Sequence, residues 1–245
     1  MKCPECGIEN NESQKYCGNC GGPLGGASIS DLFEAAFKSE ARGDLSGALE
    51  AYDRLLEKRP KSQEILFKMG MVCYDLGHLD DAIVKFRKVI EFNPRFIYAH
   101  FRLGLCLYHK CMIEEAIKSY SDALSTAPDF VPALLQLGIA NFHIGRLEKA
   151  IGAFRKVSES SCSYTLAHYY LGLAYERMRR TDEAIQQFTL VSKENPKDPS
   201  THYHLGILYK RKFMRDAAIG EFMRAHQLDP SDEATIEELS SLQQK

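Results

Sequence analysis

Apolar residues recur at helical spacing along most of the chain, in paired segments separated by short polar turns. Residues 64–76 carry Leu66, Met69 and Val72 three residues apart, and residues 80–92 carry a second set with similar spacing. This spacing places the apolar side chains on one face of a helix. Each pair of segments therefore predicts a helical hairpin, and a proline that follows the second segment ends it because proline lacks an amide donor.

The hairpin recurs with a period of 34 residues. An alanine lies twelve residues after each recurrent glycine, an aromatic residue sixteen after it and a proline twenty-four after it, with Cys162 in place of one proline. A first copy has Ala36 at the glycine position. The glycines are Gly70, Gly104, Gly138, Gly172 and Gly206. Such a period predicts an array of stacked units.

The register divides the chain into six hairpins and a terminal helix. The hairpins are 29–62, 63–96, 97–130, 131–164, 165–198 and 199–232. A single hairpin cannot bury its own apolar face, so the last face needs a cover. We expect a capping helix at 233–245, with Ala234, Ile236 and Leu239 as its apolar residues.

Glycine inside a helix costs about 1 kcal/mol relative to alanine. Its recurrence therefore predicts a place where two helices approach closely.

The third copy carries the pattern most clearly, in Leu103, Gly104, Ala116, Tyr120, Ala123 and Pro128. It resembles the tetratricopeptide repeat, and the resemblance covers about five sixths of the chain. It implies an all-α fold, a right-handed α-solenoid of helical hairpins whose first helices line a concave surface. The large aromatic residue that the family often places four residues before the glycine is replaced here. The replacements are Leu66, His100, Leu134, His168 and His202.

On such a surface, residues three before and one after each glycine share one helical face, and a position four after it extends that face. Apolar residues fill these positions, and an exposed apolar patch usually marks a partner site. The candidate groove residues are Phe33, Phe67, Met71, Tyr74, Phe101, Leu105, Tyr108, Phe142, Tyr169 and Tyr203. We expect the aromatic side chains at 67, 74, 101, 108 and 142 to be partly exposed. The alternative is that these side chains, and especially those just after each glycine, only pack against neighbouring helices.

The groove predicts a non-catalytic scaffold that binds a peptide or protein segment, which could be helical. Cations in the later interhelix turns, Arg177, Arg180, Lys210 and Arg211, form an edge that could attract an acidic part of the partner. The alternative is an ordinary solvated turn.

Residues 1–24 lie outside the repeats and predict a separate small domain. Cys3, Cys6, Cys17 and Cys20 make two Cys-x2-Cys knuckles, a spacing that suits four thiolates around a structural zinc ion. Two disulfides are the alternative, which the metal-type spacing disfavours. The stretch resembles the short zinc ribbons at the head of many bacterial and archaeal proteins. Residues 21–28 are rich in glycine, which predicts a flexible tether.

Catalytic motifs are absent from the sequence: it has no glycine-rich phosphate loop, no nucleophile elbow and no HExxH helix. We therefore expect neither an enzyme nor a small-molecule substrate. The remaining cysteines lack ligand spacing and are interpreted as packing residues. They are Cys73, Cys106, Cys111 and Cys162. His109 and His143 could approach each other, but two histidines without carboxylates make a weak metal site.

The alternative function is association of the ribbon with RNA or DNA. Against it, residues 1–26 contain only Lys2 and Lys15 as cations, with Tyr16 as the one base-stacking candidate. The net charge of −2 gives no general attraction to polyanions. No apolar run is long enough to cross a bilayer, and no apolar signal segment precedes the first knuckle, so we expect no membrane insertion and a cytoplasmic location.

Overall fold

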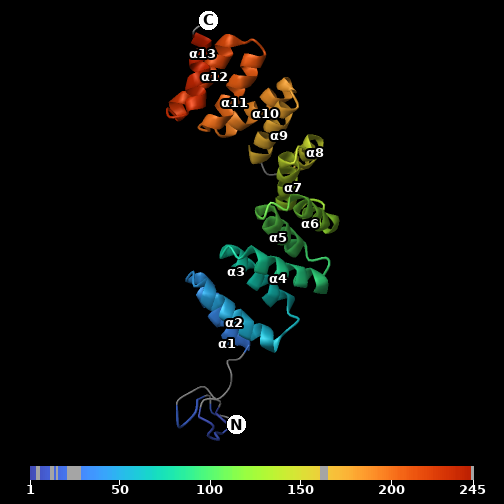
Figure 1. Cartoon of the computed structure of the whole chain (residues 1–245), viewed down its shortest axis with the longest axis vertical. Helices are drawn as coiled ribbons and strands as arrows, with labels where there is room; N and C mark the ends of the chain where they lie inside the picture. Colours follow the sequence, from blue (N-terminus) through green and yellow to red (C-terminus); the bar gives the residue numbers. More distant parts are fainter. Residues whose placement is uncertain (4–5, 12–13, 15, 21–28, 161–164, 244–245) are drawn as a thin grey trace. The chain divides into compact units, whose positions relative to one another are not determined.

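A computed structural model describes residues 1–3, 6–11, 14, 16–20, 29–160 and 165–243. The predicted tether at 21–28 and Cys162 lie outside these residues. The described part contains thirteen helices (Figure 1). Their bounds are α1 Ile29–Ala41, α2 Leu45–Lys58, α3 Gln63–Asp75, α4 Leu79–Phe92, α5 Ile97–His109, α6 Ile113–Thr126, α7 Val131–His143, α8 Leu147–Ser158, α9 Thr165–Arg177, α10 Thr181–Glu194, α11 Pro199–Arg211, α12 Arg215–Leu228 and α13 Glu233–Gln243.

The chain divides into two compact units, residues 1–106 and 107–245, with the boundary inside α5. In the first unit α1 packs on α2, α2 on α3 and α3 on α4. In the second unit each helix from α6 to α13 packs on the next, as Figure 1 shows for α11 and α12. The prediction of an all-α fold built from sequential helical hairpins is therefore confirmed.

The turns inside the hairpins share one backbone geometry. The first helix of each hairpin is followed by a residue with positive φ, and the next amide donates to a carbonyl five residues back. This is the Schellman arrangement that closes a helix C-terminus. Glycine fills the positive-φ position in three turns, whereas the other three hold larger residues. The six positions are Gly43, Gly77, Cys111, Gly145, Arg179 and Phe213.

The core of a hairpin is a buried aromatic ring of the second helix that rests on the glycine of the first. Phe86 and Phe222 are fully buried. A Cβ atom added to Gly70 would lie 2.7 Å from the Phe86 ring, and one added to Gly206 would lie 2.6 Å from the Phe222 ring. The same contact joins Gly172 to its ring, 2.8 Å from the added atom. Side chains essentially never approach so closely, so the ring occupies the space that a Cβ would need.

Helix α13 packs on α12, but the α13 side chains that are buried differ from those predicted. Ala234 and Ile236 are exposed, whereas Thr235 is completely buried. The reason is register: Asp232 caps α13 and accepts from the Thr235 amide, as Asp198 accepts from Thr201 one period earlier. Helix α13 thus continues the pattern of the first helices.

Two of the cysteines outside the ribbon are packing residues, as predicted. Cys73 and Cys106 are buried, and burial raises the pKa of both thiols, that of Cys106 to about 12. Cys111 is exposed at its turn. The two buried thiols therefore stay protonated near neutral pH and are poor nucleophiles.

Two glycine-to-alanine substitutions in the same hairpin should change the stability of the protein in opposite directions. Gly138→Ala forces a methyl group into the Phe154 ring, and overpacking costs about 1–3 kcal/mol against a helix gain of about 1 kcal/mol, so we expect a net loss of stability. Gly152→Ala in α8 meets open space and should stabilise by about 0.5–1 kcal/mol. Urea unfolding followed by far-UV circular dichroism measures both. Equal shifts for the two variants would contradict the role of the ring.

Candidate functional site

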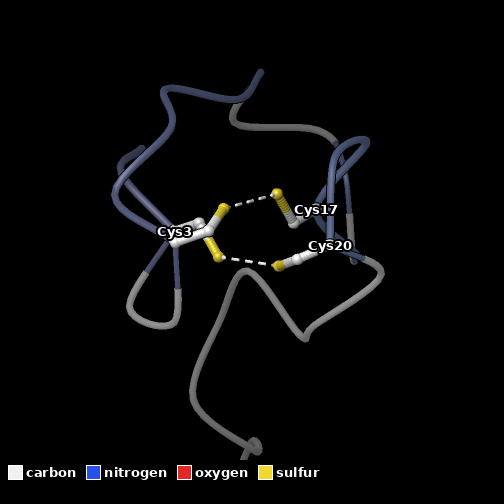
Figure 2. A group of neighbouring side chains, drawn as sticks. Cys3, Cys17 and Cys20 are labelled. Atoms are coloured by element: carbon white, nitrogen blue, oxygen red, sulfur yellow. Dashed lines mark hydrogen bonds between the residues drawn. The ribbon is translucent and has the colours of Figure 1, made fainter.

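The four cysteines of the ribbon converge on one point. Their sulfur atoms all lie within 4.8 Å of one another. Figure 2 shows Cys3 of the first knuckle on one side of the cluster, facing Cys17 and Cys20 of the second knuckle. The Sγ atoms of Cys3 and Cys20 are 3.5 Å apart, and those of Cys6 and Cys17 are 3.6 Å apart.

These separations fit a metal ion. A zinc–sulfur bond of about 2.3 Å in tetrahedral geometry places sulfurs roughly 3.8 Å apart, close to the observed values. A disulfide needs about 2.05 Å between its sulfurs. Among the described residues this is the only group of three or more potential ligands within reach of one ion. The cluster could therefore hold a metal.

The backbone of the first knuckle is a tight hairpin. The amide of Cys3 donates to Ile8 O at 2.8 Å, and the amide of Gly7 donates to Cys3 O at 2.9 Å. Gly7 has a φ of 73°, a left-handed conformation that glycine adopts without the clash of a Cβ. The glycine after Cys6 therefore lets the chain fold back around the sulfurs.

The second knuckle stabilises a thiolate. Hydrogen bonds from the backbone amides of Cys20 and Asn19, together with one from the Asn10 side chain, lower the pKa of the Cys17 thiol to about 6. Asn10 is a residue to which the motif alone assigned no function. The sequence offers two signals for it: Asn10 is one of the residues that carry the resemblance to zinc ribbons, and its short side chain has both a donor and an acceptor.

The second candidate site is a row of side chains on the first helices, which we call the first-helix stripe. These residues lie three positions before each recurrent glycine or its equivalent. They are Phe33, Phe67, Phe101, Leu135, Tyr169 and Tyr203. All six are half-buried. Each therefore has one apolar side in the core and another that meets solvent.

The inner side of the stripe packs on the buried rings of the second helices. The ring centroids of Phe67 and Phe86 are 5.6 Å apart, and those of Tyr203 and Phe222 are 5.8 Å apart. Tyr169 meets its second-helix ring edge-on at 5.7 Å. The ring that rests on the glycine thus also holds the stripe residue in place.

Two surface hollows open beside stripe residues, one in each unit. The first has a volume of about 500 Å³ and the second about 350 Å³. Phe37, 67% exposed, lines the first. The first hollow is lined by Ser30, Phe33, Glu34, Phe37, Tyr52, Glu64 and Lys68, and the second by Thr165, Leu166, Tyr169, Val191, Asn195, Asp198 and Ser200.

Most of the other candidate groove residues are also half-buried, namely Met71, Tyr74, Leu105 and Tyr108. The hydroxyl of Tyr108 lies 2.7 Å from Nδ1 of His143. His143 was paired with His109 in the sequence analysis as a weak metal site, and this contact with Tyr108 occupies one of its ring nitrogens.

Phe142 is a correction. Partial exposure was expected, but the side chain is only 4% exposed. The guanidinium of Arg177 lies 4.0 Å from the centre of the Phe142 ring, and its Nη1 donates to Phe142 O at 3.3 Å. A cation on the next hairpin covers the ring, so Phe142 belongs to the core and Arg177 to its cover.

The remaining cations of the predicted edge also have partners within the chain. Each pairs with a carboxylate from its own turn, a neighbouring hairpin or α13. An acidic ligand would have to compete with these carboxylates. The pairs are Arg180 with Glu183 at 2.5 Å, Arg211 with Glu176 at 3.0 Å, and Lys210 with Glu238.

The histidines at the position of the missing aromatic act as structural residues. His100 Nε2 lies 2.9 Å from Pro94 O, and His202 Nε2 lies 3.2 Å from Pro196 O. Each ties the start of a first helix to the proline that precedes it.

None of the helices in the described residues is both long and apolar enough to span a bilayer.

Three family descriptions match parts of the chain. "TPR repeat" matches residues 70–110, "Tetratricopeptide repeat" matches 97–130, and a second "Tetratricopeptide repeat" family matches 132–160 and 166–198. Among the curated proteins, none is similar enough to count as a match.

Solved structures share the fold. The crystal structure of the MamA protein is 27% identical, with a TM-score of 0.65 over 69% of this chain and 92% of that one. YrrB, a TPR protein with an unusual peptide-binding site, is 20% identical, with a TM-score of 0.71 over 78% of this chain and 98% of its own. PilF of Pseudomonas aeruginosa is 17% identical, with a TM-score of 0.68 over 88% and 96%.

Thiol reactivity tests the cluster and the core together. In the metal-loaded protein we expect iodoacetamide to modify Cys111 quickly, whereas the four ribbon thiols react only after a strong chelator removes the metal. Cys73 and Cys106 should react only after the helices unfold, because burial keeps both protonated. Peptide mass spectrometry reads each site separately. Chelator-independent modification of the ribbon would contradict a metal site.

Proposed function

Because the chain is built from tetratricopeptide repeats, we propose that it is a non-catalytic scaffold that binds an apolar peptide segment along the first-helix stripe. Each unit carries three stripe residues, and in each a hollow lies beside one of them. Within either unit, the ligand would lie across the first helices, with its apolar side chains against the stripe residues of that unit.

The stripe itself carries the proposal. An apolar residue is half-buried at the same position in all six hairpins. Packing alone would place such side chains fully inside, and solubility would favour polar ones. A partly exposed apolar row that is already fixed by core contacts loses little entropy when a ligand covers it.

The binding free energy that the stripe can supply is modest, which fits reversible binding. Burying a whole Phe or Leu side chain is worth about 1.5–3 kcal/mol, so the part of a stripe residue that is still exposed offers at most roughly 1 kcal/mol. Three such contacts do not exceed the cost of association on their own. Polar groups must therefore contribute, and Asp198, Ser200 and Asn195 stand beside Tyr169 in the second hollow. They would bind the backbone of an extended peptide.

Similarity to YrrB supports the same kind of ligand, since that protein has a peptide-binding site on the same fold. The likeness concerns the fold alone, so the residues that bind must come from this chain. Here they are the stripe residues and the polar groups of the hollows.

We further propose that the ribbon binds zinc as a structural ion through Cys3, Cys6, Cys17 and Cys20. Zinc, when bound, would cross-link the two knuckles and supply folding free energy to a segment with almost no apolar core. The ribbon would be an accessory module. Reduced thiols persist in a reducing compartment, which favours the cytoplasm.

Peptides selected from a random display library against the intact chain provide the probe. Tyr169→Ala with Tyr203→Ala should weaken their binding at least tenfold, because aromatic anchors carry much of an interface's energy. The matched control is Leu190→Ala with Met223→Ala, which removes exposed apolar side chains from the second helices of the same hairpins. Calorimetry measures the affinities, and circular dichroism checks that both variants remain folded.

Equal affinity of both double variants would overturn the stripe as the binding surface. If only the control double variant loses affinity for the peptides, the binding site lies on the second helices instead.

A further inference from the structure

We propose that Asn10 is a positioning residue that joins the two knuckles and strengthens metal binding through a hydrogen bond to the Cys17 sulfur. This inference rests on the proposed zinc site. It assigns a function to a side chain outside the four ligands.

Three hydrogen bonds place the Asn10 side chain. Its Nδ2 donates to Cys17 Sγ at 3.4 Å and to Ile8 O at 2.8 Å, and its Oδ1 accepts from the Gly18 amide at 3.0 Å. Both ends of the amide are therefore used, and the donor and acceptor are directed to different groups. The side chain reaches from the first hairpin into the second knuckle.

The backbone of Asn10 is fixed as well. Its amide donates to Met1 O at 2.8 Å, and the Met1 amino group donates to Asn10 O at 2.7 Å. An antiparallel bridge between Lys2 and Glu9 continues this pairing. Asn10 is thus held against the strand-like segment that leads into Cys3.

The charge of the site explains why a donor here matters. Four thiolates around a divalent cation leave a net charge of −2, and N–H groups directed at sulfur offset it. The backbone amides of Cys20 and Asn19 do this from within the second knuckle. Asn10 adds a donor from the other knuckle, so the same contact that tunes the ligand also fixes the distance between the knuckles.

The neighbouring residue offers a matched control. Asn11 is exposed, and its backbone amide donates to Gln14 Oε1 at 3.2 Å. Among the described residues, no hydrogen bond connects its side chain to a cysteine. Changing Asn11 therefore alters the same stretch of chain and the same residue type without touching the sulfur.

The experiment uses the full chain and four variants: Asn10→Ala, Asn10→Asp, Asn11→Ala and Asn11→Asp. Zinc affinity is measured by competition with a chromophoric chelator, and the cobalt-substituted proteins report ligand geometry by their absorption. Asn10→Ala should weaken zinc binding about 10- to 100-fold, as the loss of a hydrogen bond to a metal ligand typically does. Asn11→Ala should stay within about twofold of the unmodified chain, since it removes no contact to a ligand.

Asn10→Asp separates the two functions of the side chain. It keeps an oxygen for the Gly18 amide but places a carboxylate oxygen against the Cys17 thiolate. We expect it to lose at least as much affinity as Asn10→Ala, and to lose more than Asn11→Asp, which controls for the added charge.

The outcomes are distinct. If the unmodified chain does not bind one zinc ion tightly, the proposed zinc site fails. If it does, and the Asn10 and Asn11 variants match, the function assigned to Asn10 is overturned. If Asn10→Asp binds like the unmodified chain, the hydrogen bond to sulfur is overturned and only the contact to Gly18 remains.

Discussion

The contact between a buried second-helix ring and a glycine of the first helix is the constraint on which the hairpins of Gly70, Gly138, Gly172 and Gly206 depend. The ring fills the space that a Cβ would take, so the two helix backbones approach closely around it. Its other side supports the stripe residue, as Phe86 supports Phe67. Glycine is a poor helix former, and the array accepts that cost because packing more than offsets it. Fold and candidate binding surface therefore share one contact.

The ribbon is stabilised by different physics. Its described residues bury little more than Cys3 and Cys17, so apolar burial cannot hold it together. With the proposed zinc site, a metal ion and a few hydrogen bonds would do so, and these depend on thiol chemistry rather than on packing. The helical hairpins and the ribbon would consequently respond to different treatments: a chelator should affect the ribbon, and denaturant should affect both.

Sequence predicted the features that repeat and missed those that do not. The period identified the hairpins and the glycine contacts, and the cysteine spacing identified the cluster, because both depend on residue type at a fixed interval. Phe142 was misjudged because Arg177, one hairpin away, covers it. The contacts of Asn10 with Cys17 and Gly18 arise only through a fold that brings the second knuckle beside it. Contacts between side chains of adjacent units are set by competition among neighbours, which a periodic pattern does not encode.

The interhelix turns close with the same backbone geometry whether the positive-φ residue is Gly77 or Phe213. The first helix of any hairpin therefore leads into its second helix through the same turn. Excising or duplicating a whole unit between two such turns would rejoin the chain without a new loop. Array length can thus change in evolution by recombination of whole modules, and the number of ligand contacts would change in step with it.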